Sequence, residues 1–315
     1  MKQRIGWIDI SKGILIILVI IGHSHINTLL DYAINAFHMA GFFLLSGITF
    51  NGKRRFKDFV KRKINSLLLP YVVFSFILIA YQYVSHILLG TNFSLVSGVV
   101  SMLIPISGRE GTTVYHLWFL PCLFLAEIVI YWIVRAYRKK KVAGIGFASV
   151  GILFGVLAYS LTGIASIISV LPLAVGFMLV GFCSRSRLKN AKPLLLIASA
   201  LFFIVFTICN YRFGAKSVDM SSMTLGIWPL YFLCGLSGGI FVVCLSQMIG
   251  NSKVLEAIGS KSLYYYGLHY EVLGVANKIR GGVVAAALTL TTLYIVFYLY
   301  DKLKINLVRK GRDIA

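Results

Sequence analysis

Long apolar runs recur from one end of the sequence to the other, separated by short polar connections. A helix needs about 20 apolar residues to cross a bilayer, and these runs have roughly that length. The chain is 58% hydrophobic and 13% charged, a composition far from that of a soluble domain. We therefore predict an all-α polytopic membrane protein with about ten transmembrane helices, in which residues 1–315 form a single domain. The expected spans are 7–25, 33–50, 67–89, 116–137, 142–162, 167–183, 193–211, 225–249, 262–277 and 281–300.

The basic residues indicate how the expected spans are oriented. Of the 31 Lys and Arg residues, 26 fall in connections that share one side of the membrane and 5 fall on the other side. Basic loops remain in the cytoplasm, so this alternation predicts that the N- and C-termini are both cytoplasmic. The net charge of +21 then reflects topology, and the expected partner is the lipid bilayer and not nucleic acid, which needs a basic surface on a soluble domain. The five cysteines show no metal-ligand spacing, so we expect no metal site.

Three ionisable residues interrupt the first apolar run, WIDISKGILIILVIIGHSH. On a helix with about 100° per residue, Lys12 and His23 share one face about 16 Å apart along the axis, and Asp9 lies within about 40° of that line. An ionisable group at membrane depth costs about 2.5 to 3.5 kcal/mol, so this polar stripe should face the protein interior or a water-filled cavity. An acid, an amine and an imidazole in one row favour a catalytic function over simple anchoring.

Other ionisable groups in apolar runs allow more than one interpretation. For His38 and His269, each taken singly, a hydrogen bond to a neighbouring helix is the preferred interpretation. Glu127, in the middle of WFLPCLFLAEI, needs a partner such as Lys12 or an imidazole, because an unpaired carboxylate is strongly disfavoured there. A structural ion pair without chemistry is an equally open interpretation of Glu127. Trp118 is expected to belong to the aromatic belt at the membrane surface.

The connection 53–63 concentrates basic residues beside the third expected span. Its default interpretation is a topology determinant that is attracted to anionic lipid. The alternative is a site for a phosphate-rich soluble cofactor, in which Arg62, Lys63 and Lys12 donate charge-assisted hydrogen bonds to phosphate.

Five phrases, in order along the whole chain, resemble acyltransferase family 3, the multi-span membrane O-acyltransferases that modify bacterial cell-surface glycans. They are IDISKGILIILVIIGHS, AFHMAGFFLLSGITF, KRKINSLLLPY, HLWFLPCLFLAEI and IGSKSLYYYGLHYEV. The first phrase resembles the family's first-helix signature, a basic residue and a histidine separated by ten residues, here Lys12 and His23. The sequence departs from the family where two arginines three apart are expected, because Lys63 and Ser66 stand there and Arg62 is the nearest substitute.

The resemblance implies an O-acyltransferase, with O-acetyl transfer the expected reaction, in the plasma membrane of a bacterium. Its donor would be acetyl-CoA or another acyl-CoA reached from the cytoplasm, and its acceptor a hydroxyl of a cell-surface or lipid-linked carbohydrate. His23 would act as general base or itself accept the acyl group, while Asp9 or Glu127 orients the imidazole or neutralises Lys12. The expected binding residues are Lys12, Arg62 and Lys63 for the donor, and His38, Ser46, Trp118 and His269 for the substrate.

A transporter or flippase of a glycan or lipid precursor is the alternative function. Buried charges in ten spans would suit it, but such proteins often carry inverted repeats, and no repeat is evident in this sequence. A membrane sensor or scaffold would need an interaction domain, which the sequence does not show. The identity of the acceptor sugar stays open at this stage.

Overall fold

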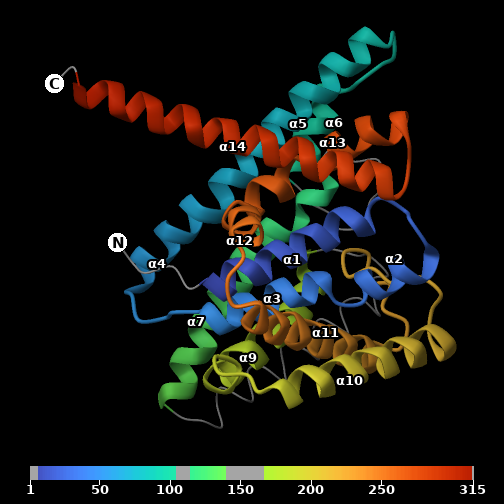
Figure 1. Cartoon of the computed structure of the whole chain (residues 1–315), viewed down its shortest axis with the longest axis vertical. Helices are drawn as coiled ribbons and strands as arrows, with labels where there is room; N and C mark the ends of the chain where they lie inside the picture. The colour runs from blue at the N-terminus through green and yellow to red at the C-terminus, as the bar shows by residue number, and fades with distance from the viewer. Residues whose placement is uncertain (1–5, 104–113, 140–166, 314–315) are drawn as a thin grey trace.

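The structure is a computed structural model that describes residues 6–103, 114–139 and 167–313 (Figure 1). Within these ranges the chain is helical, and the only β-bridge joins Asp219 to Thr224. The helices are α1 (Gly6–Gly22), α2 (Thr28–Asn35), α3 (His38–Thr49), α4 (Phe56–Lys63), α5 (Leu69–Leu88), α6 (Leu95–Leu103), α7 (Phe119–Lys139), α9 (Ile167–Leu188), α10 (Pro193–Phe213), α11 (Trp228–Ile249), α12 (Lys253–Ser260), α13 (Ser262–Ile279) and α14 (Val283–Asp313). The protein is an all-α polytopic membrane protein, as its apolar runs predict.

Seven helical segments of the described chain are long and apolar enough to cross a membrane. They are Thr28–Thr49, Phe56–Leu88, Tyr115–Tyr137, Ile167–Leu188, Pro193–Phe213, Trp228–Ile249 and Val283–Lys304. Each coincides with one of the ten expected spans. α1 and α13, at the first and ninth expected spans, are helices of 17 and 18 residues that fall outside these seven. The fifth expected span, 142–162, lies outside the described residues.

The basic segment before the third span is helical. The sequence predicts a connection over 53–63, whereas α4 runs through a π-helical turn, Ile64–Leu68, directly into α5. Pro70 accounts for the wider turn, because proline has no N–H to donate and its ring crowds the carbonyl four residues before it. The basic residues of α4 are therefore held on one continuous helical segment, Phe56–Leu88.

α1 lies in the interior of the bundle, where it packs against α3, α11, α12 and α13 (Figure 1). It meets α12 at two glycines, since a Cβ added to Gly13 or to Gly259 would overlap the backbone of the other helix. α3 meets α9 in the same way at Gly47 and Gly181. Lipid tails are as apolar as a protein core, so close backbone packing at small residues is a main source of helix association in a membrane.

α10 shows the opposite arrangement, with its apolar side chains on the outside. Leu194, Leu201 and Ile208 are 75%, 59% and 61% exposed, while the buried residues of this helix are Ser199 and Asn210. A helix that turns polar groups inward and large apolar groups outward is placed against lipid and not against water. α10 therefore marks the perimeter of the bundle.

The two ends of the bundle carry different groups. α4, the start of α1 and the end of α14 lie towards the left of Figure 1, whereas α2 and the connection between α10 and α11 lie towards the right. α1 runs from the first end to the second. Its Asp9 and Lys12 therefore lie near one end of the bundle, and His23 lies at the other.

Candidate active site

His23 follows the last residue of α1 and is half-buried in the wall of a cavity of about 1070 Å³. We call this space the His23 cavity. Four segments form its wall: 19–39 at the end of α1 and over α2, 115–118, the connection 216–224, and 266–277 of α13. Small-molecule sites in proteins occupy about 300 to 1,000 Å³, so the cavity can hold a substrate of substantial size.

Two further histidines lie beside His23 and form what we call the imidazole cluster. The ring centres of His23 and His269 are 5.4 Å apart, and those of His116 and His269 are 5.9 Å apart. Tyr270 packs against the cluster, with its ring stacked on His116 at 5.0 Å and edge-on to His23 at 6.0 Å. His23 and His116 line the cavity, whereas His269 lies behind them and is fully buried. Within the described residues, no group of three His, Cys, Asp or Glu side chains is arranged to hold a metal ion.

The hydrogen bonds of the histidines indicate which ring nitrogens carry a proton. Nδ1 of His269 donates to the carbonyl of Tyr266 at 2.8 Å, because a carbonyl oxygen only accepts. Nδ1 of His38 donates to the carbonyl of Ile34 at the same distance. Nε2 of His269 and both ring nitrogens of His116 have no hydrogen-bond partner among the described residues. Buried polar atoms are usually paired, so these nitrogens are candidates for contact with a ligand or for proton transfer.

Tyr266 holds His116 in place through the backbone. Its hydroxyl donates to the carbonyl of His116 and accepts a hydrogen bond from the amide of Phe119 at 3.3 Å. His116 belongs to a 3₁₀ turn, Tyr115–Trp118, that leads directly into α7 at Phe119. α13 therefore positions both His269 and His116. The backbone of α13 holds the His269 ring, and the Tyr266 side chain of α13 holds the backbone of His116.

Two carboxylates stand on the cavity wall, Asp31 of α2 and Asp219 of the connection between α10 and α11. Asp219 accepts hydrogen bonds from the amides of Ser221 and Ser222 at 2.9 and 3.2 Å, and from the Ser221 hydroxyl. Asn210 of α10 fixes the end of this connection through hydrogen bonds to the backbone of residues 225 and 227. This pairing is why α11 begins at Trp228, three residues later than the sequence predicts.

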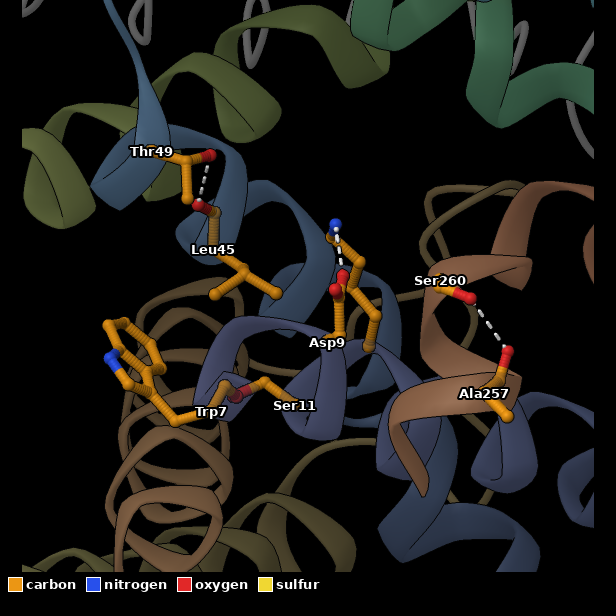
Figure 2. Close-up of polar contacts among 8 residues, drawn as sticks. Trp7, Asp9, Ser11, Leu45, Thr49, Ala257 and Ser260 are labelled. Carbon is orange, nitrogen blue, oxygen red and sulfur yellow. Dashed lines mark hydrogen bonds and ion pairs between the residues drawn. The ribbon is translucent and has the colours of Figure 1, made fainter. Parts of the chain in front are cut away.

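The carboxylates that the sequence analysis singled out make ion pairs at the other end of the bundle. Asp9 lies 3.1 Å from the Lys12 ammonium, a contact that can be followed in Figure 2. Glu127 of α7 lies 2.6 Å from the Lys63 ammonium of α4 and is 6% exposed. Asp9 is fourteen residues from His23, about 21 Å along a helix, so its partner is Lys12 and not the imidazole. Of the interpretations left open for Glu127, the structure shows an ion pair with Lys63.

Of the four residues expected to bind the substrate, two line the His23 cavity and two do not. His38 and Trp118 line the His23 cavity, and His269 lies behind its wall. Trp118 is 6% exposed, so it packs inside the protein instead of lying in a belt at the membrane surface. Ser46 is eight residues further along α3 than His38, about 12 Å along the axis, and is not among the cavity-lining residues.

The sequence analysis did not single out His116, Asp31, Asp219 or Tyr270, all of which line the cavity. A signal existed for His116, which opens the HLWFL phrase at the start of an expected span. No sequence signal marks the other three. They lie in a short helix, a connection and the middle of α13, and only tertiary packing brings them beside His23.

Comparisons with known proteins complete the description of the site. The family model of acyltransferase family 3, described as an acyltransferase domain, matches residues 5–301. The searches of curated proteins and of solved structures found no match. The match spans α1 to α14 and includes every residue of the imidazole cluster and of both ion pairs described above.

Proposed function

The chain belongs to acyltransferase family 3 and is a membrane acyltransferase, and from this premise we propose that it moves an acetyl group from cytoplasmic acetyl-CoA to a carbohydrate hydroxyl. The acceptor would be a cell-surface or lipid-linked glycan, and the location the plasma membrane of a bacterium. The observation that carries the proposal is the position of His23, an imidazole in the wall of a cavity of about 1070 Å³.

The walls of the His23 cavity suit a ligand with many hydroxyl groups. Asp31 and Asp219 offer carboxylate oxygens that accept hydrogen bonds from hydroxyls. Trp118, Tyr115 and Tyr270 add aromatic surface beside them, which packs against the apolar faces of sugar rings. Lys216 also lines the cavity, but its ammonium already donates to the carbonyl of Tyr211 at 2.8 Å.

In this mechanism neutral His23 acts as general base. Its imidazole takes the proton of the acceptor hydroxyl while that oxygen attacks the thioester carbonyl carbon. A C–O ester bond forms, the C–S bond breaks, and the sulfur leaves as the thiolate of CoA, which takes up a proton from the imidazolium. His116 lines the same cavity, and its ring nitrogens have no hydrogen-bond partner among the described residues, so it can take part in this proton transfer. In the two-step variant the acetyl group is carried first by the His23 imidazole and then by the acceptor.

The remaining predicted residues act at the other end of α1. Asp9 pairs with Lys12, and Glu127 pairs with Lys63, near the place where a phosphate-bearing donor would enter. Arg62 precedes Lys63 on α4 and is exposed. In the proposal, Lys12, Arg62 and Lys63 contact the donor, and the positive-inside rule predicts that they lie on the cytoplasmic side.

Labelled acetyl-CoA and purified protein in lipid vesicles test the proposal. The expected result is release of free CoA in proportion to added glycan acceptor, with the label recovered on the glycan. Mass spectrometry of surface glycans from cells with and without the gene should show a difference of one acetyl unit. Movement of the glycan across the vesicle membrane without release of CoA would instead identify a transporter or flippase.

A further inference from the structure

A second cavity, of about 330 Å³, lies at the opposite end of α1 from His23. We call it the Trp7 cavity. The start of α1, the end of α3 with residues 50–53, and the end of α9 form its wall. Trp7 and Phe50 supply aromatic surface, while Lys53, Arg185 and Lys189 supply positive charge. No Asp or Glu is among its lining residues.

The three cations differ from Lys12 and Lys63 because, within the described residues, they have no carboxylate partner. Lys12 and Lys63 are each paired with a carboxylate. Among the ion pairs of residues 6–103, 114–139 and 167–313, none includes Lys53, Arg185 or Lys189. Three unpaired cations around a concave surface create a positive potential that attracts anions, and Arg and Lys bind phosphates by charge-assisted hydrogen bonds.

The apolar part of the cavity narrows the chemistry of the ligand. Trp7 gives a flat ring on which a planar heterocycle can stack. The Arg185 guanidinium lies 4.4 Å from the centre of the Phe182 ring, so its position is restricted by packing. Aromatic surface beside a cluster of cations is the combination that recognises a base joined to phosphates, that is, a nucleotide.

The distance between the two cavities fits an extended ligand. Trp7 precedes His23 by sixteen residues, about 24 Å along a helix. Ile8, which lines the Trp7 cavity, is four residues before Lys12 and so lies on the same face of α1. A donor with its phosphates at the Trp7 cavity would therefore pass Lys12 on the way to His23, and acyl-CoA carries its thioester at the end remote from its nucleotide.

We propose that the Trp7 cavity binds the nucleotide end of the acyl donor, with Lys53, Arg185 and Lys189 contacting its phosphates and Trp7 its base. This inference rests on the proposed acetyl transfer from acetyl-CoA. It adds a donor site on α1, α3 and α9 to the cations of α1 and α4 that the sequence analysis singled out.

The test compares two acetyl donors, acetyl-CoA and S-acetyl-N-acetylcysteamine, which is a thioester without the nucleotide. The double variant Arg185→Gln/Lys189→Gln should raise KM for acetyl-CoA by about tenfold or more with little change in kcat, which corresponds to about 1.4 kcal/mol or more. Its KM for the nucleotide-free donor should stay unchanged. The matched control is Arg187→Gln/Lys192→Gln, which removes two exposed charges from the same segment without touching the cavity and should leave both KM values unchanged.

Three outcomes would overturn the inference. One is an equal effect of the two double variants, and another is an equal rise in KM for both donors. The third is an unchanged KM for acetyl-CoA in Arg185→Gln/Lys189→Gln, combined with a loss of thermal stabilisation by anionic phospholipid vesicles that the wild type shows. That result would assign the cavity to a lipid phosphate. Failure of the proposed function would look different, because the wild type would then transfer acetyl from neither donor.

Discussion

The polar side chains at the two ends of α1 differ in whether they have partners. At the first end, the ammonium groups of Lys12 and Lys63 are each joined to a carboxylate. At the second end, the imidazole cluster keeps three ring nitrogens without a partner among the described residues, beside a cavity of about 1070 Å³. An unsatisfied buried polar atom costs about 1 to 3 kcal/mol. The difference indicates that the charges of Lys12 and Lys63 are neutralised at the first end, whereas the second end keeps its unpaired ring nitrogens for a ligand.

The largest effect should come from removing His23. In His23→Ala, acetyl transfer should fall by about 10²- to 10⁴-fold, the usual contribution of a positioned general base, while the amount of protein in the membrane stays unchanged. Release of CoA by the purified variant measures the loss. His86→Ala is the matched control, because His86 lies on α5 and is not among the cavity-lining residues. A wild-type rate for His23→Ala would remove this residue from the mechanism.

Breaking the Lys63–Glu127 pair tests how much this ion pair, at the first end of α1, contributes to stability. Glu127→Gln leaves the Lys63 ammonium, 24% exposed, without its carboxylate, so we expect a loss of about 2 to 3 kcal/mol in stability and a lower midpoint of thermal unfolding in detergent. The double variant Lys63→Met/Glu127→Gln should recover much of this loss, since it removes the unpaired charge as well. An unchanged midpoint for Glu127→Gln would show that the pair contributes nothing to the fold.

His116→Phe separates packing from proton transfer at the imidazole cluster. Phenylalanine keeps a ring against Tyr270 and removes two nitrogens that have no partner in the described part of the chain, so stability should not fall. We expect kcat to fall by about a hundredfold, the lower end of an acid–base contribution, with KM for acetyl-CoA unchanged. A pH profile of kcat for the variant and the wild type should differ in shape, and identical profiles and rates would limit His116 to packing.

The smallest effect should come from the Lys12–Asp9 pair. The Lys12 side chain is 36% exposed, and pairs this open to solvent contribute about 1 kcal/mol or less. Lys12→Gln should therefore shift the unfolding midpoint far less than Glu127→Gln does. An equal shift for the two variants would contradict the distinction drawn here between a half-exposed pair and a buried one.

The fold follows from local properties of the sequence to a large extent. Each apolar run must satisfy its own backbone hydrogen bonds within a membrane, so length and hydropathy alone predict a helix. The seven candidate spans of the described chain each match an expected one. The basic connection 53–63 differs from the prediction because α4 begins at Phe56 and continues through the π-helical turn Ile64–Leu68 into α5.

The candidate site was predicted only in part. His23, His38 and Trp118 line the cavity, and their catalytic and substrate-binding roles stay predictions. Asp219 was missed because no sequence pattern marks it, and His116 was missed although it opens the HLWFL phrase. Their importance becomes visible only when α7, α13 and the connection before α11 meet at the end of α1.

The sequence by itself determined that this chain is a multi-span membrane protein of acyltransferase family 3, and that Lys12 and His23 stand on the first helix. Tertiary structure decided which groups are partners. Lys63 and Glu127 are 64 residues apart in the sequence and 2.6 Å apart in space, while His23 and His269 come from opposite ends of the chain. The hydropathy of a helix depends only on its own residues, so it can be read from the sequence. The partner of a charge or an imidazole depends on which helices pack together, and the sequence of one helix does not specify its neighbours.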